Sequence, residues 1–173
     1  MVLFLIAETM FFAAFVGAYI VVRLASETWR PDVLEDMVSA LVIGNSVVLF
    51  VSAFTMALAQ RSTHRGDPRG LNFWLFASLV LGVLFVGGQV FEFKRLLEVV
   101  PFGGNIFGSV FYSLSGFHAI HVTGGVVLLV YVLVNALRGK YNAYQATGVH
   151  MGAAYWYFVV VAWIFLFYGL YIW

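Results

Sequence analysis

The stretch LFLIAETMFFAAFVGAYIVV, residues 3–22, decides the fold class. It is apolar along nearly its whole length, and its one carboxylate is Glu8, followed by Thr9. A helix of 20 residues is about 30 Å long, which matches the hydrocarbon core of a bilayer. The stretch therefore predicts a transmembrane helix. An acid inside such a helix is costly unless it has a partner, so Glu8 is the first candidate functional residue.

The composition agrees with a membrane protein. Of the 173 residues, 63% are hydrophobic and 10% are charged, whereas a soluble domain is about one quarter charged. The chain has no cysteine, which excludes disulfides and thiolate metal sites. The basic residues form no stripe, so we expect no nucleic-acid partner. The first apolar stretch is too long to be typical of a cleaved signal peptide.

Four further apolar stretches follow the first. Each is apolar almost all round and long enough to cross the hydrocarbon core. We therefore predict an all-α fold, a bundle of five transmembrane helices in one domain over residues 1–173. The predicted spans are 2–22, 38–60, 71–93, 106–137 and 149–173. Five crossings place the two ends of the chain on opposite faces of the membrane.

Lysine and arginine counts predict the orientation. The face shared with the N-terminus carries five basic residues: Arg61, Arg65, Arg69, Arg138 and Lys140. The other face carries four: Arg23, Arg30, Lys94 and Arg95. The first connection on that second face is also acidic, with Glu27, Asp32, Glu35 and Asp36. We therefore expect the N-terminus in the cytoplasm and the C-terminus outside.

Glu8 and His121 are expected at the same depth. With a rise of about 1.5 Å per residue, each lies about 9 Å from the cytoplasmic edge of its span. A contact between them would lower the desolvation cost of both side chains. The alternative is that serine, threonine or backbone groups satisfy each of them separately.

The remaining polar groups within the spans allow several interpretations. His118 and His121 are three residues apart and lie on one helix face. A haem would need histidines on both of its sides, and His64 and His150 lie at loops or span ends. A metal held by Glu8, His118 and His121 is compatible with the ligand types. Histidines bonded to neighbouring helices are the simpler interpretation.

Gln89 and Glu92 are a second pair three residues apart, close to Lys94 and Arg95. Their place near the end of the third span predicts a solvated or salt-bridged helix end. Nothing in the sequence resembles a nucleophile with a base, a phosphate loop or a pair of catalytic carboxylates. We therefore expect no catalytic centre, no metal and no cofactor in this chain.

Five strings resemble successive motifs of the cytochrome c oxidase subunit III family. They are LIAETMFFAAF, GNSVVLFVSAFT, LGVLFVGGQVFEF, FYSLSGFHAIHVTGG and YWYFVVVAWIFLF, one on each span and in family order. The chain looks like the five-span bacterial form. Within the motifs, Glu8 matches the family's carbodiimide-reactive acid. Gln89 and Glu92 match its GQ-x-x-E, and His118 and His121 match its GFH-x-x-H.

The resemblance implies a subunit of a respiratory haem-copper oxidase, which reduces dioxygen to water and pumps protons across a bacterial plasma membrane. The haems and coppers would belong to partner subunits I and II. This chain would pack on subunit I, beside small subunits or a larger respiratory assembly. It would bind phospholipids and support sustained turnover and proton uptake. Glu8, Gln89, Glu92, His118 and His121 would be its proton-active or structural polar groups.

The last span departs from the family pattern E-x-x-x-x-YWHFVD-x-VW. Tyr157 replaces the histidine, Val159 is assigned to the aspartate, and His150 falls at the glutamate. These changes put any role of that span in proton handling or lipid-headgroup contact in doubt.

Three alternatives stay open. The first two are a quinol oxidase subunit III and an accessory protein of nitric oxide reductase from the same superfamily. The third is a small proton-coupled transporter with Glu8 as its proton site. Relatives of the second kind tend to lack the acid at Glu8, and the chain shows no inverted repeat typical of a transporter.

Overall fold

The fold is a bundle of long helices, seen in a computed structural model that describes residues 1–25, 40–99, 106–141 and 146–172. In these ranges the helices are α1 (Val2–Ala25), α2 (Ala40–His64), α3 (Pro68–Val99), α4 (Ile106–Leu137) and α5 (Thr147–Phe167). A π-helical turn, Tyr168–Ile172, continues α5. The acidic residues of the first connection, and Arg30 with them, lie outside the described residues.

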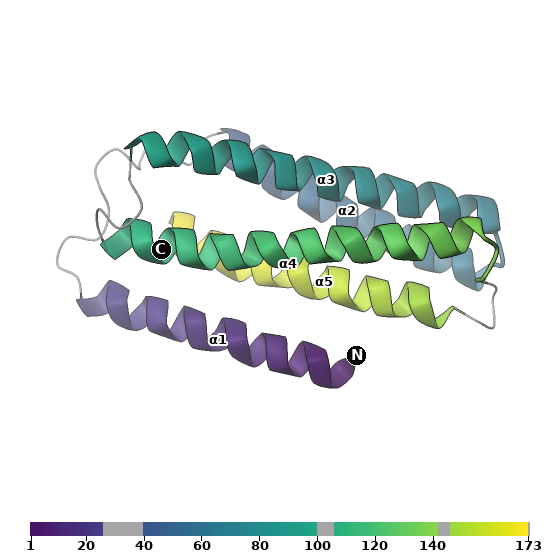
Figure 1. The fold of residues 1–173 in the computed structure, drawn as a ribbon, viewed down its shortest axis with the longest axis horizontal. Helices are drawn as coiled ribbons and strands as arrows, with labels where there is room; N and C mark the ends of the chain where they lie inside the picture. Colours follow the sequence, from purple (N-terminus) through teal and green to yellow (C-terminus); the bar gives the residue numbers. More distant parts are fainter. Residues whose placement is uncertain (26–39, 100–105, 142–145, 173) are drawn as a thin grey trace.

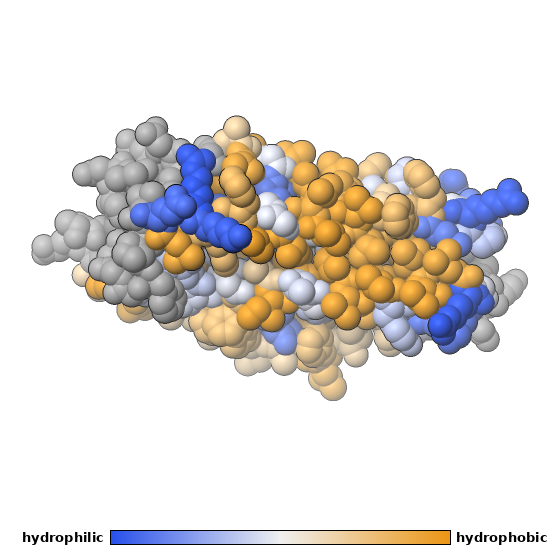
Figure 2. Space-filling view, turned by 45° about the horizontal axis from the view of Figure 1, so that its top comes forward, coloured by the Kyte–Doolittle hydropathy of each residue, from blue (hydrophilic) through white to orange (hydrophobic). Residues whose placement is uncertain are grey.

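All five helices are long and apolar enough to cross a membrane, as predicted. They have 24, 25, 32, 32 and 21 residues. The N- and C-termini lie at opposite ends of the bundle (Figure 1). On the face shown in Figure 2, a broad hydrophobic belt covers the middle of the molecule, and most hydrophilic side chains lie toward the ends. The chain is a multi-pass membrane protein.

The third helix extends beyond the predicted span 71–93 at both ends. It begins at Pro68, where the fixed φ of proline suits a first turn, and Asp67 Oδ1 accepts a hydrogen bond from the backbone N–H of Arg69 (3.1 Å). At its other end it runs on to Val99, because the charged side chains there are good helix formers. At about 48 Å, a helix of this length is longer than the hydrocarbon core.

A tight turn joins α2 to α3. Gly66 has a φ of +67°, which a residue with a Cβ adopts only at a cost. The N–H of Gly66 bonds to the carbonyl of Thr63, and the N–H of Asp67 bonds to that of Ser62. This pair of bonds is the Schellman arrangement, which ends a helix and satisfies its last carbonyls. The two helices therefore form an antiparallel hairpin, which lies along one side of the bundle in Figure 1.

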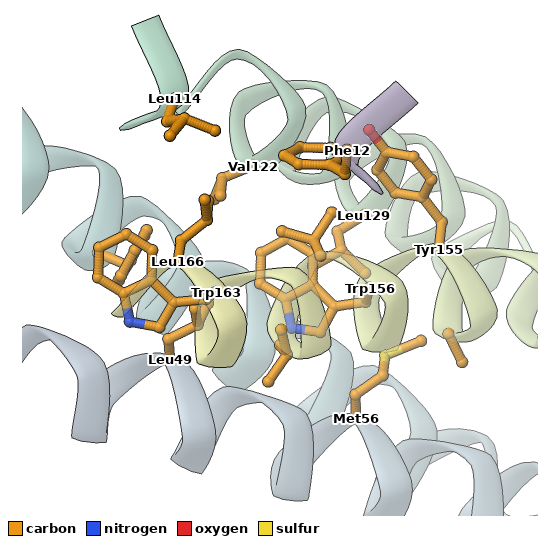
Figure 3. Packing of buried hydrophobic residues seen from close by; sticks show 14 of the residues in the cluster. Phe12, Leu49, Met56, Leu114, Val122, Leu129, Tyr155, Trp156, Trp163 and Leu166 are labelled. Carbon is orange, nitrogen blue, oxygen red and sulfur yellow. The ribbon is translucent and has the colours of Figure 1, made fainter. Parts of the chain in front are cut away.

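The core is centred on two tryptophans of α5. Trp156 and Trp163 are fully buried, and Figure 3 shows their indole nitrogens pointing toward α2. Trp156 Nε1 donates to Ser52 Oγ (3.0 Å), and Trp163 Nε1 donates to Ser46 Oγ (2.9 Å). Hydrogen bonds of this kind hold helices together in lipid, where no hydrophobic force drives their association.

Glycine on α3 and α4 makes room for Trp156. A Cβ at Gly82 would lie 2.6 Å from Trp156 Cη2, and one at Gly125 would lie 2.9 Å from Trp156 Cε3. Both distances are shorter than real Cβ contacts, so any larger side chain would push the indole out of place. The α3, α4 and α5 backbones can therefore approach one another around a single large ring.

The first helix is attached to one side of the bundle only. It packs against α4 and α5 and lies apart from the α2–α3 hairpin in Figure 1. Phe12 and Tyr19 are its buried residues, and the Tyr19 hydroxyl donates to the carbonyl of Gly169 beyond the end of α5. Most of its other side chains face outward.

Candidate functional site

Glu8 and His121 are in contact, as their depths predicted. Glu8 Oε2 lies 2.8 Å from His121 Nε2, and the side chains are 22% and 14% exposed. His121 Nδ1 lies 2.6 Å from the carbonyl oxygen of Phe117. A carbonyl only accepts, so Nδ1 carries a hydrogen. Nε2 is then the ring nitrogen that faces the Glu8 carboxyl group.

Aromatic rings surround this pair. The Phe12 ring lies 4.9 Å from that of His121, centroid to centroid, and the Phe11 ring lies 6.3 Å away. Tyr155 on α5 donates its hydroxyl hydrogen to the backbone carbonyl of His121 (3.0 Å). The sequence analysis missed Tyr155, although a tyrosine within an apolar span is a signal that its hydroxyl needs an acceptor. Apolar rings beside the pair lower the polarity of its surroundings and so strengthen the Glu8–His121 interaction.

His118 lies in a different environment. Its side chain is fully buried, and the ring stacks on Trp163 with centroids 5.1 Å apart and an interplanar angle of 26°. Neither ring nitrogen has a hydrogen-bond partner among the described residues. The expectation of histidines bonded to neighbouring helices is therefore right for His121 and wrong for His118, which its aromatic neighbours hold by packing.

The three residues considered as metal ligands, Glu8, His118 and His121, do not form a common metal site. Glu8 bonds to His121, while the Phe12 ring lies against both histidines, 6.4 Å from His118 and 4.9 Å from His121. In the described part of the chain, no group of three or more histidine, aspartate or glutamate side chains is placed to hold a metal ion.

The prediction of a solvated or salt-bridged helix end at Gln89 and Glu92 is wrong. Gln89 is 1% exposed, and its Nε2 donates to Glu92 Oε2 (3.3 Å). The Tyr171 hydroxyl donates to Glu92 Oε1. Two features explain the difference. The helix α3 continues past Glu92, and the π-helical turn after α5 brings Tyr171 onto it.

Replacing Tyr171 by phenylalanine should destabilise the protein by about 1–3 kcal/mol, because Glu92 Oε1 would lose its donor inside the bundle. Reversible unfolding in mixed detergent micelles measures the effect. Tyr168→Phe is the matched control, since Tyr168 is 57% exposed. Equal stability of the two variants would show that the hydrogen bond to Glu92 contributes nothing.

A second polar network lies at the other end of the bundle. The Tyr157 hydroxyl donates to Gln60 Oε1 (2.9 Å), and Gln60 Nε2 lies 3.3 Å from His150 Nδ1. The His64 ring lies against that of His150. Two of the positions that depart from the family pattern therefore bond to each other through Gln60, which the sequence analysis did not identify.

The aspartate of the family pattern was aligned with the wrong valine of this chain. Counting from Tyr155 and Trp156, the aspartate of YWHFVD falls at Val160, not at Val159. Both valines are buried in the core. A buried valine therefore takes the place of the family's aspartate in either alignment.

Fold and site together define a class: a five-helix membrane protein in which two acids, Glu8 and Glu92, bond to side chains of other helical segments. The family model described as cytochrome c oxidase subunit III matches residues 1–173. The chain belongs to the cytochrome c oxidase subunit III family.

Curated relatives agree with this membership. A probable cytochrome c oxidase subunit 3 of Nocardia farcinica is 36% identical over 172 residues, which are 98% of this chain and 84% of the relative. The cytochrome c oxidase subunit 3 of Thermostichus vulcanus is 36% identical over 173 residues, 99% of this chain and 85% of the relative. The cytochrome c oxidase subunit 3 of Synechocystis is 35% identical over 172 residues, which are 99% of this chain and 73% of the relative.

Proposed function

We propose that this chain is a non-catalytic supporting subunit of a respiratory haem-copper oxidase that takes electrons from cytochrome c, reduces dioxygen to water and pumps protons. The family match over the whole chain carries the proposal, and the names of the relatives favour cytochrome c over quinol. Haem and copper are assigned to subunits I and II. The buried acids agree with a supporting role, because each is bonded to a side chain of this protein.

The Glu8–His121 pair is proposed to serve proton uptake and structure together. It contains one proton that can move between Nε2 and Oε2 without changing the net charge of the pair. Such a pair can hold a helix in place inside lipid and still exchange a proton with a neighbouring water. We assign the same double role to the Gln89–Glu92–Tyr171 group, while His118 serves packing.

Phospholipid binding is proposed for a groove between α1 and α5. The groove has a volume of 440 Å³, and its lining is almost entirely apolar, with Phe12, Ala13, Gly17, Phe158 and Phe165 among its residues. An acyl chain suits such a lining. Contact with subunit I is proposed for other parts of the apolar belt in Figure 2. The proposed location is the bacterial plasma membrane, with the N-terminus in the cytoplasm.

Purification of the tagged chain from its native membranes in a mild detergent tests the proposal. We expect a complex that contains a large many-span subunit, shows a haem spectrum and contains copper. The same chain expressed without its partners should show no haem absorbance. A chain that purifies from native membranes without any haem-copper partner would overturn the proposed function.

A further inference from the structure

Two histidines meet at the end of the bundle that carries Arg61 and Arg65. His64 is the last residue of α2, and His150 lies in the first turn of α5. Their ring centroids are 5.1 Å apart, with an interplanar angle of 40°. His64 is exposed and His150 is partly buried. The pair therefore lies where ions from water can reach it.

The ring separation suits a shared metal ion. Zinc binds imidazole nitrogen at about 2.0–2.1 Å, so each ring centroid would lie about 3.2 Å from the metal, and a tetrahedral angle would place the two centroids about 5 Å apart. The observed 5.1 Å matches this value. The two rings are therefore close enough to share one metal ion.

His150 also has a side-chain partner for its Nδ1. A metal-binding histidine bonds through its other ring nitrogen to an oxygen acceptor, which fixes the tautomer and the ring orientation. In the structure the Gln60 atom nearest His150 Nδ1 is the amide nitrogen. His150 Nδ1 lies 3.3 Å from the Gln60 amide, and Tyr157 holds that amide on its other side. Amide oxygen and nitrogen can exchange places by a flip. In the flipped state Nδ1–H donates to the amide oxygen, the amide N–H donates to the Tyr157 hydroxyl oxygen in place of the bond from that hydroxyl, and Nε2 is free to bind a metal.

We propose that His64 and His150 form a two-histidine site for a transition-metal dication of the Zn²⁺ class, oriented by Gln60 and Tyr157. Imidazole ligands suit Zn²⁺, Ni²⁺ and Cu²⁺. No third histidine, aspartate or glutamate completes the set within the described residues, so water fills the other positions. The inference is independent of the oxidase role.

Zinc titration of the full chain tests the proposal. The chain contains no cysteine, so a histidine-free affinity tag leaves only its native imidazoles and carboxylates as ligands. The protein is reconstituted in lipid nanodiscs, and Zn²⁺ affinity is measured by competition with a chromophoric chelator. We expect one Zn²⁺ per chain, and His64→Ala and His150→Ala should each weaken binding by at least about tenfold.

Three further variants distinguish Zn²⁺ binding at a specific site from non-specific attraction of Zn²⁺ to the protein. Gln60→Leu keeps both histidines and should weaken binding about 10- to 100-fold. Arg65→Ala removes an exposed charge from the same helix end and should not weaken binding. His150→Gln guards against a folding defect, because its amide can still bond to Gln60. Zinc binding that is absent, or unchanged by both histidine variants, would overturn the proposal.

Discussion

A chain in which Glu8 is replaced by alanine should hold α1 less tightly against α4 and α5, at a cost of about 2 kcal/mol. The carboxylate makes a polar contact between α1 and α4, and its loss removes that partner from His121 Nε2 beside the rings of Phe11 and Phe12. The cost is smaller than for a fully buried ion pair, because both side chains are partly exposed. Glu8→Gln should be milder, since an amide can still donate to His121.

Two measurements check this result. Unfolding in mixed micelles gives the loss of stability. Spin labels at Ala13 and Val161, which both line the α1–α5 groove, report the distance between the two helices after replacement by cysteine. Thr9→Ala is the control, because the Thr9 hydroxyl bonds only to the carbonyl of Leu5 in its own helix. A Glu8→Ala chain with the stability and distances of the control would contradict the prediction.

In the assembled oxidase the same variants separate support from catalysis. We expect Glu8→Gln to keep its initial rate of oxygen reduction, since the redox centres are assigned to partner subunits. Carbodiimide labelling of this chain should fall. Loss of the first electron transfer in a fully assembled Glu8→Gln complex would overturn the supporting role.

Replacing Trp163 by alanine should have the largest effect on stability, about 3 kcal/mol or more. The indole is fully buried, stacks on His118, packs edge-on against Phe85 and donates to Ser46. Unfolded helices stay in lipid, so the lost contacts and the cavity account for most of the cost. Heat or detergent denaturation of the reconstituted chain measures it.

Two comparisons make the tryptophan prediction specific. Phe165→Ala changes a ring of α5 that is 66% exposed and should cost little. Trp163→Phe keeps most of the ring packing and loses the N–H donor, so its cost should be about 1 kcal/mol. An alanine variant at Trp163 that is as stable as Phe165→Ala would show that the aromatic layer around His118 is dispensable.

The features that depend only on position along a single helix could be predicted from the sequence. Hydrophobic length identified five membrane-spanning helices, because every backbone polar group in lipid has to be satisfied within its own helix. The rise per residue of a helix then placed Glu8 and His121 at the same depth in the membrane. A polar side chain in lipid needs a hydrogen-bonding or charged partner, so a contact between the two was predicted. Neither step needed the packing order of the helices.

Other contacts depended on that packing order. Gln89 and Glu92 looked like a helix end because charged residues follow them, yet a turn beyond α5 covers them with Tyr171. The two histidines at the bundle end are 86 positions apart in sequence and meet only because α2 packs against α5. The orientation of the His118 ring depends on Trp163, and no pattern in a single helix indicates it.

The Glu8–His121 contact also sets a timing problem for biosynthesis. The two residues are 113 positions apart in sequence, and a ribosome adds about 5–20 residues per second. An acid that enters the bilayer with α1 therefore waits about 6–23 s for its histidine to be made. During that interval the carboxyl group must be protonated, stay near water or be shielded by the insertion machinery. Helix α1 can therefore complete its packing only after α4 and α5 have been made.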